Sequence, residues 1–211
     1  AVAAHPDVDY VTVEHTLDDG AKEKLILAKP LLEKVFKDKE VKVLDTFKGK
    51  KLKGVKYQPL FTFVPPPKPA HYVALADYVT TEDGTGLVHI APAFGAEDME
   101  VGKEYDLPVL MTVLPNGTFI SEVTPWRGQY IKDADPLIIQ DLQARGLLFR
   151  AETYTHAYPF CWRCKTALMY YARDSWYIRT SALSTWAAAL PAALRSAASS
   201  ACSLARSVRW P

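Results

Sequence analysis

The sequence has no apolar run that approaches the about 18 residues that a membrane-spanning helix requires. Its first five residues carry neither the basic block nor the apolar block of a secretory signal peptide. It has only three cysteines in 211 residues, which are too few for a disulfide scaffold and suit a reducing compartment. These absences together predict a soluble, cytoplasmic protein.

An excess of charge of either sign is also absent, because 25 lysines and arginines face 24 acidic residues and leave a net charge of +1. No whole-molecule field therefore attracts DNA or an anionic membrane, and any site for a polyanion must be local. The balance of 49% hydrophobic and 23% charged residues is that of a globular protein with a core. The first methionine is Met99, so we expect the chain to be trimmed or excised from a longer protein.

The amino-terminal part predicts β structure. Residues 10–15 alternate apolar and polar side chains, and a second apolar run follows at 24–28 after a turn at 18–20, which is the pattern of a β-hairpin. Pro30 opens a stripe of apolar residues at helical spacing, which predicts a short helix. Residues 41–47 return to a strand.

Twelve lysines lie between positions 22 and 56, and those from 48 to 56 have no acidic neighbour. A solvated sheet edge explains them, since lysines protect edges against pairing. The other interpretation is a patch that contacts phosphates, which makes the chain a non-catalytic module that binds RNA. The lysines concerned are Lys48, Lys50, Lys51, Lys53 and Lys56.

The middle of the chain alternates predicted strands with turns. The proline-rich residues 64–69 predict a stiff surface connection, because proline fixes φ and donates no hydrogen bond. Residues 72–79 and 87–91 are strand-like, with a glycine-rich turn at 82–86 between them. Residues 95–105 predict a helix whose first turn carries carboxylates that complement the helix dipole.

The second half predicts one more hairpin and one clear helix. Residues 109–113 and 118–123 flank a Pro-Asn-Gly turn and predict the hairpin. The helix is predicted to begin with Asp135 as N-cap and Pro136 as its first helical residue, and to end at Gly146.

Residues 147–154 predict a further strand, so strands dominate and the helices are short and interspersed. This mixture predicts an α+β domain around a β-barrel-like core. No acidic residue follows Asp174, and residues 182–211 form an atypical tail rich in alanine and serine. We therefore expect a domain at 1–181 followed by that tail.

The densest candidate for chemistry is the segment 84–98. It reads as a tight turn, a strand that carries His89, a proline stop, and a helix start that bears Glu97 and Asp98. A satisfied core histidine and an ordinary first-turn helix acid explain the same residues. The segment lacks the GxGxxG and GxxxxGK[ST] spacings of nucleotide-binding loops, so residue types alone leave both interpretations open.

Segment 84–98, Gly-Thr-Gly-Leu-Val-His-Ile-Ala-Pro-Ala-Phe-Gly-Ala-Glu-Asp, resembles the signature of the editing (CP1) domain inserted into class I isoleucyl-tRNA synthetases. The valyl and leucyl members usually have Pro-Ala-His-Asp where this chain has Pro-Ala-Phe-Gly, and they lack a histidine at the place of His89. A second match, at residues 158–164 and 170–179, resembles the point where the inserted domain returns to the synthetase body. The resemblance covers residues 2–181 in order.

The resemblance implies hydrolysis of an ester, in which valine wrongly attached to isoleucine tRNA is cleaved from the terminal adenosine. A second site is needed because one missing methylene gives a pocket only about 1–3 kcal/mol of discrimination, a limit for which the isoleucyl enzyme is the standard example. The implied partners are the valine-carrying 3′ end of that tRNA and the catalytic body of the same synthetase. The competing interpretation is a non-catalytic module that binds the tRNA acceptor end.

The resemblance also assigns roles to residues. Asp98 holds the α-ammonium group of the substrate through a charge-assisted contact. His89 lines the pocket that takes valine and excludes isoleucine, so we expect a steric and polar role for it rather than that of a general base. Tyr158 stacks on the terminal adenosine or is a structural tyrosine. Asp98 and His89 are thus the candidate catalytic residues, and the substrate-binding positions are Gly84, Thr85, Gly86, Phe94, Gly95 and Tyr158.

Other family features lie outside the sequence. A threonine-rich strand of the editing site precedes the segment that matches residues 1–10, so we expect an editing domain that is incomplete at its amino-terminal end. The adenylation motifs HIGH and KMSKS are absent, so aminoacylation with ATP and magnesium belongs to the rest of the parent enzyme.

Cys161 and Cys164 have the CxxC spacing of a redox pair or of half a zinc site. Residues 165–168 do not predict the helix that normally follows a redox pair. Tetrahedral zinc needs four ligands, so we expect zinc only with ligands from outside this chain, and no cofactor for editing itself.

Overall fold

The structure is a computed structural model that describes residues 1–17, 20–37, 39–153, 157–176 and 178. Contacts divide the chain into two units, Ala1–Ala172 and Arg173–Pro211, and the fold below is that of the first unit. The predicted tail at 182–211 lies outside the described residues.

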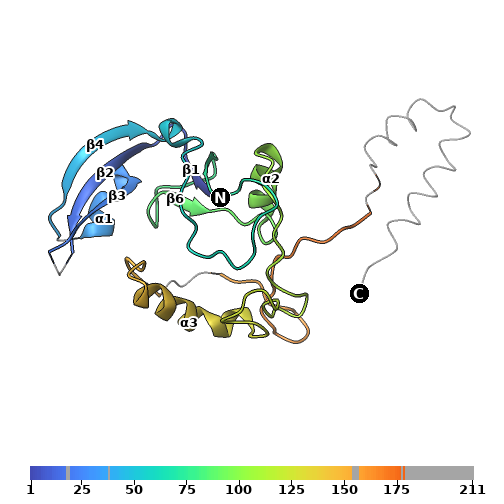
Figure 1. Cartoon of the computed structure of the whole chain (residues 1–211). Coiled ribbons are helices and arrows are strands. Elements are labelled where there is room, and N and C mark those ends of the chain that lie inside the picture. The colour runs from blue at the N-terminus through green and yellow to red at the C-terminus, as the bar shows by residue number, and fades with distance from the viewer. Residues whose placement is uncertain (18–19, 38, 154–156, 177, 179–211) are drawn as a thin grey trace, which may run out of the picture. The chain divides into compact units, whose positions relative to one another are not determined.

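Short strands and helices are interspersed along the first unit (Figure 1), which confirms the predicted α+β class. Within the described residues, no helix combines the length and the apolar character needed to cross a lipid bilayer. The elements in chain order are β1 (Val2–Ala4), β2 (Asp9–Thr16), β3 (Lys22–Ala28), the 3₁₀ turn η1 (Lys29–Leu31), α1 (Leu32–Phe36), β4 (Lys42–Lys48), the 3₁₀ turn η2 (Gly49–Leu52), β5 (Val73–Leu75), β6 (Leu87–His89), α2 (Ala96–Glu104) and α3 (Ile131–Ala144).

The predicted hairpin forms the first sheet, in the order β3-β2-β4. β2 pairs antiparallel with β3 from Tyr10 to Thr16 and with β4 on its other edge, so the strand predicted at 41–47 is also confirmed. Val11 and Val13 of β2 are fully buried, because the predicted short helix, present as η1 and α1, packs against them. The other buried members of this core include Leu27, Leu31, Val35 and Phe36.

The second sheet has the order β5-β1-β6, with β1 parallel to β5 and antiparallel to β6. The strands predicted at 72–79 and 87–91 are present as β5 and β6 but are only three residues long each. A turn in which the Val79 N–H donates to the Ala76 carbonyl at 3.4 Å follows β5 and prevents it from continuing.

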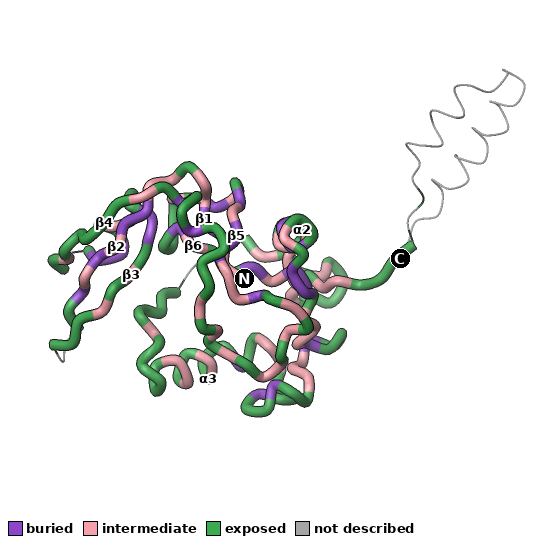
Figure 2. The backbone as a smooth tube through the Cα atoms, turned by 45° about the horizontal axis from the view of Figure 1, so that its top comes forward, coloured by how far each residue is buried: buried purple, intermediate pink, exposed green. Residues whose placement is uncertain are grey.

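The strands of the described residues do not close into the predicted barrel-like arrangement. Closure requires the edge strands of one sheet to pair, whereas each sheet here ends in an open edge and no ladder joins the two sheets. Figure 2 shows buried positions along β1 and β2, while β4 is exposed over almost its whole length. Two of the buried clusters therefore lie on two small open sheets, each covered by short helices or connecting segments.

The helix predicted at 95–105 is confirmed as α2. The predicted end of α3 is confirmed as well, because Gly146 adopts a φ of 65°. Its N–H donates to the Gln143 carbonyl at 3.0 Å, and the next N–H donates to the Leu142 carbonyl at 2.9 Å. These two hydrogen bonds form a Schellman motif.

The predicted start of α3 is wrong, because Asp135 and Pro136 lie inside the helix rather than at its first turn. A proline at an interior position removes one helical hydrogen bond. The additional turn forms nevertheless, because it buries Ala134 completely against Val123 and Trp126. Packing of this turn outweighs the local preference for a proline start.

Replacing Pro136 by alanine is therefore expected to raise the free energy of unfolding by about 2–3 kcal/mol. An interior proline costs a helix about 3 kcal/mol, and the stiffness that proline gives to the unfolded chain offsets up to about 1 kcal/mol of this. Urea unfolding followed by far-UV circular dichroism measures the change. The exposed neighbour Asp135→Ala serves as control, with an expected change below about 0.5 kcal/mol. Unchanged or lower stability of Pro136→Ala contradicts the prediction.

The hairpin predicted from residues 109–113 and 118–123 is reduced to its turn. The Leu114 N–H donates to the Thr118 carbonyl at 2.8 Å, but the flanking segments pair only through an isolated bridge between Val113 and Phe119. Prolines at 108 and 115 limit the backbone donors available to extend this ladder.

The strand predicted at 147–154 is absent from its described part, residues 147–153. The Phe149 ring packs instead against the rings of His15 and Phe36, with centroids 5.8 and 5.7 Å apart. The Arg150 guanidinium donates to the Val35 carbonyl at 2.8 Å. These tertiary contacts hold the segment outside both sheets.

Candidate functional site

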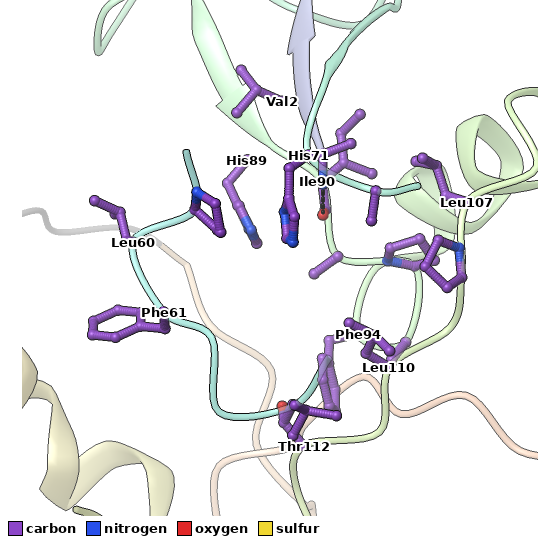
Figure 3. Close-up of a pocket in the computed structure, with 18 of the residues that line it drawn as sticks. Val2, Leu60, Phe61, His71, His89, Ile90, Phe94, Leu107, Leu110 and Thr112 are labelled. Carbon is purple, nitrogen blue, oxygen red and sulfur yellow. Dashed lines mark hydrogen bonds between the residues drawn. The ribbon is translucent and has the colours of Figure 1, made fainter. Parts of the chain in front are cut away.

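A large, mostly apolar cavity lies in the first unit and has a volume of about 830 Å³ (Figure 3). Six consecutive residues of the signature segment, 89–94, form one wall. The other walls come from residues 57–61 and 63–64 and from positions between 107 and 112. The aromatic side chains that line the cavity are Tyr57, Phe61, Phe63, His71, His89 and Phe94.

The wall at 89–94 is held by distant parts of the chain. The Ile90 N–H donates to the Ala1 carbonyl at 2.9 Å, next to the pairing of β6 with β1. At the other end of the wall, the Ala172 N–H donates to the Ala93 carbonyl at 2.8 Å. The first and last residues of the unit therefore fix this wall from both ends.

The Asp98 carboxylate lies directly behind the wall. Asp98 is in the first turn of α2, whose N-cap is the extended Gly95. Oδ2 accepts the Ala91 N–H at 3.0 Å, and Oδ1 accepts the Tyr78 hydroxyl at 3.0 Å. Asp98 itself is half-buried and is not among the described residues that line the cavity, whereas Ala91 is. The carboxylate thus braces the wall and retains lone pairs for a further donor.

The negative charge of Asp98 acts on groups at the cavity. Burial lowers the pKa of His89, whereas Asp98 acts in the opposite direction. His89 lines the cavity, so the field of Asp98 reaches this space and offsets part of the cost of burying a cation there.

Two histidines contribute to the cavity, and Figure 3 shows their rings extending into it. His89 ends β6, where it pairs with Val2, and its lowered pKa favours the neutral imidazole. His71 packs against Tyr57 with ring centroids 6.0 Å apart. Sequence reasoning singled out His89 and missed His71, because His71 follows a proline-rich connection with no periodic pattern around it.

The predicted Gly-Thr-Gly positions lie against the first sheet, and none of the three lines the cavity. The Thr85 carbonyl accepts the Ala28 N–H at 2.8 Å, and the Gly86 carbonyl accepts the Tyr10 hydroxyl at 2.6 Å. Gly84 and Gly86 adopt φ values of 72° and 73°, which favour glycine. The turn therefore connects the two sheets.

The remaining substrate-binding candidates occupy different places. Phe94 lines the cavity. Gly95 does not, but a Cβ added there lies 2.6 Å from Asp98 Oδ2, so the position of the carboxylate requires glycine at 95. Tyr158 is not among the residues that line the cavity, and its hydroxyl donates to the Leu168 carbonyl at 2.7 Å.

Cys161 and Cys164 lie on a tight turn in which the Cys161 N–H donates to the Thr166 carbonyl at 2.8 Å. Hydrogen bonding to Thr166, whose hydroxyl is 3.2 Å from the Cys164 sulfur, lowers the pKa of the Cys164 thiol to about 7. In the part of the chain that the structure describes, no group of three or more His, Cys, Asp or Glu side chains is placed to hold a metal ion. Two thiols are half of a tetrahedral zinc site, so the described residues do not fit a complete one.

The five lysines that have no acidic neighbour in the sequence are all exposed. The Lys48 ammonium lies 3.0 Å from an Asp9 carboxylate oxygen, and the Lys53 ammonium lies 5.7 Å from the centroid of the Tyr105 ring. Lys48 ends β4, an edge strand of the first sheet, and so agrees with the interpretation as a solvated edge, whereas Lys53 follows η2 and lies on no strand. The exposed patch also includes Lys50, Lys51 and Lys56.

The chain is similar to curated isoleucine–tRNA ligases. It is 49% identical to that of Clostridium novyi and 51% identical to that of Streptomyces avermitilis, each over 183 residues that cover 87% of this chain and 17% of the relative. The enzyme of Pyrococcus furiosus is 46% identical over 191 residues, which cover 86% of this chain and 18% of the relative. The chain therefore spans less than a fifth of the length of these relatives.

Among solved structures, the chain is similar to the crystal structure of GlLeuRS-CP1, with a TM-score of 0.51. The match covers 72% of this chain and 77% of that chain at 14% identity, which shows a shared fold. No protein-family model matches the chain.

Proposed function

We propose that this chain, which belongs to the isoleucyl-tRNA synthetase family as its CP1 editing domain, contributes the site that hydrolyses valyl-tRNA formed on isoleucine tRNA. One observation carries the proposal. The signature residues 89–94 form a wall of an apolar cavity, and a hydrogen-bonded carboxylate, that of Asp98, lies behind this wall.

The chemistry of the substrate fits this arrangement. An aminoacyl ester carries an α-ammonium group beside an apolar side chain, so it needs a carboxylate next to an apolar space. In the proposal Asp98 binds the ammonium, and the cavity beside His89 admits the side chain of valine. Water then attacks the ester carbonyl, the bond to the ribose oxygen breaks, and free valine and tRNA with its terminal hydroxyl result.

The proposal extends to partners and cofactors. The partners are the 3′ end of isoleucine tRNA and the catalytic body of the same cytoplasmic synthetase, in which ATP and magnesium serve aminoacylation. We propose hydrolysis without a cofactor, and zinc at Cys161 and Cys164 only where further ligands complete the site.

Deacylation of valyl-tRNA, charged on the isoleucine acceptor, by the full chain tests the proposal. We expect release of valine above the spontaneous rate and at least about tenfold faster than release of isoleucine from the correctly charged tRNA, because one methylene is worth about 1–3 kcal/mol in a pocket. Equal rates for the two esters contradict the proposal. Binding of the tRNA without hydrolysis, with a steep dependence on salt, supports the RNA-binding alternative.

A further inference from the structure

We infer that Tyr78 is a positioning residue, which orients the Asp98 carboxylate so that it binds the α-ammonium group of the aminoacyl ester. This inference rests on the proposed function. Tyr78 lies outside the signature segment and outside the residues that line the cavity, and it acts on the substrate only through Asp98.

The hydrogen bonds of Asp98 carry the inference. A carboxylate that is held at one oxygen can still rotate about its bond to Cβ, whereas one that is held at both oxygens cannot. The Ala91 N–H holds Oδ2 at 3.0 Å, and the Tyr78 hydroxyl holds Oδ1 at 3.0 Å. Each oxygen retains a lone pair, so the orientation set by Tyr78 decides where a third donor is accepted.

The surroundings of Tyr78 give it a fixed position from which to act. It lies in the turn after β5 and packs against a buried cluster that includes Val79 and Ile90. The backbone of Gly95 closes the other side of the carboxylate, because a Cβ there lies 2.6 Å from Oδ2. Burial, and next the hydrogen bond to Asp98, raise the pKa of Tyr78, so its hydroxyl stays protonated as a donor at neutral pH.

A positioning role differs from a structural one in what it discriminates. A misplaced carboxylate weakens the binding only of ligands that carry an ammonium group. A general loosening of the site weakens the binding of all ligands alike. Tyr72 offers a matched comparison, because its hydroxyl donates to the Tyr105 carbonyl at 2.8 Å and its ring packs against the same buried cluster as Tyr78.

The test compares the full chain with its Tyr78→Phe and Tyr72→Phe variants. The probes are adenosine carrying valine through a non-hydrolysable 3′-amide and the same compound with a hydroxyl in place of the α-amine. Calorimetry measures the Kd of each. We expect Tyr78→Phe to raise the Kd of the amine probe about tenfold, the value of one hydrogen bond to a charged group, and that of the hydroxyl probe less than about twofold. Tyr72→Phe should change neither Kd.

Equal changes for both probes, or no change in Tyr78→Phe, overturn the inference. An Asp98→Asn background supplies a second measurement, in which Tyr78→Phe should cause no further loss of preference for the amine, and an additive loss overturns the inference too. A full chain with no preference for the amine probe instead overturns the Asp98 contact of the proposed function, and the inference falls with it.

Discussion

Replacing Asp98 by asparagine is expected to slow the hydrolysis of valyl-tRNA about 100-fold while the fold is retained. Asparagine has the shape of aspartate, and its amide can accept the Ala91 N–H and donate to the oxygen of Tyr78, so both hydrogen bonds of the native side chain keep a counterpart. The negative charge is lost, and hydrogen bonds to charged groups contribute about 1.5–3 kcal/mol. This difference is of the order that a 100-fold effect requires.

Glu97→Gln is the matched control, because Glu97 lies in the same turn of α2, is exposed, and loses the same charge. Initial rates of deacylation at constant salt measure both variants, and we expect less than a twofold effect for Glu97→Gln. A similar loss of rate in both variants means that the long-range electrostatic potential of the helix acids, rather than contact between Asp98 and the substrate, is responsible. A full rate in Asp98→Asn removes Asp98 from the mechanism.

Gly86→Ala is expected to destabilise the protein by about 3–5 kcal/mol, a large share of the about 5–15 kcal/mol that stabilises an ordinary domain. The φ of 73° costs a residue with a Cβ about 1–2 kcal/mol. The added Cβ also lies 2.3 Å from the Cβ of Ala28, so the turn must move. Movement strains the hydrogen bonds that the turn makes to Ala28 and to Tyr10, which join the two sheets.

Gly84→Ala separates the two contributions. Its φ of 72° is almost the same, but no atom lies within 4 Å of the added Cβ. We expect a loss of about 1 kcal/mol, since only the backbone conformation is penalised. Thermal and urea unfolding of both variants give the comparison. Equal effects at the two positions contradict the view that the turn is held by its contact with Ala28.

Elements with a strong local signal were predicted well. In the hairpin of β2 and β3, β2 alternates apolar and polar side chains and β3 ends in an apolar run, so one face had to be buried. Gly146 has no Cβ and ends α3 in the left-handed conformation that other residues avoid. In both cases the physical cause lies within a few residues of the element itself.

Elements whose conformation depends on contacts with residues distant in the sequence were predicted poorly. Pro136 signals a helix start, but burial of Ala134 extended α3 past it. Residues 147–153 have the composition of a strand, but Phe149 finds an aromatic partner in His15 rather than a sheet edge. For residues other than proline and glycine, local propensity is worth tenths of a kcal/mol, whereas burial of a large apolar side chain is worth about 1.5–3 kcal/mol, so packing outweighs propensity at residues 147–153.

The candidate site likewise has parts that the sequence predicts locally and parts that only the folded chain brings together. The sequence by itself determined the segment that forms the wall at 89–94 and the presence of the Asp98 carboxylate at a helix start, because these are contiguous. Only the tertiary structure brought Tyr78 to Asp98, placed His71 in the cavity, and directed the Gly-Thr-Gly turn to Ala28 instead of the cavity. The reason is that a motif specifies backbone conformation and residue type locally, whereas a cavity and a hydrogen-bonded carboxylate are made by groups that meet only after the chain has folded.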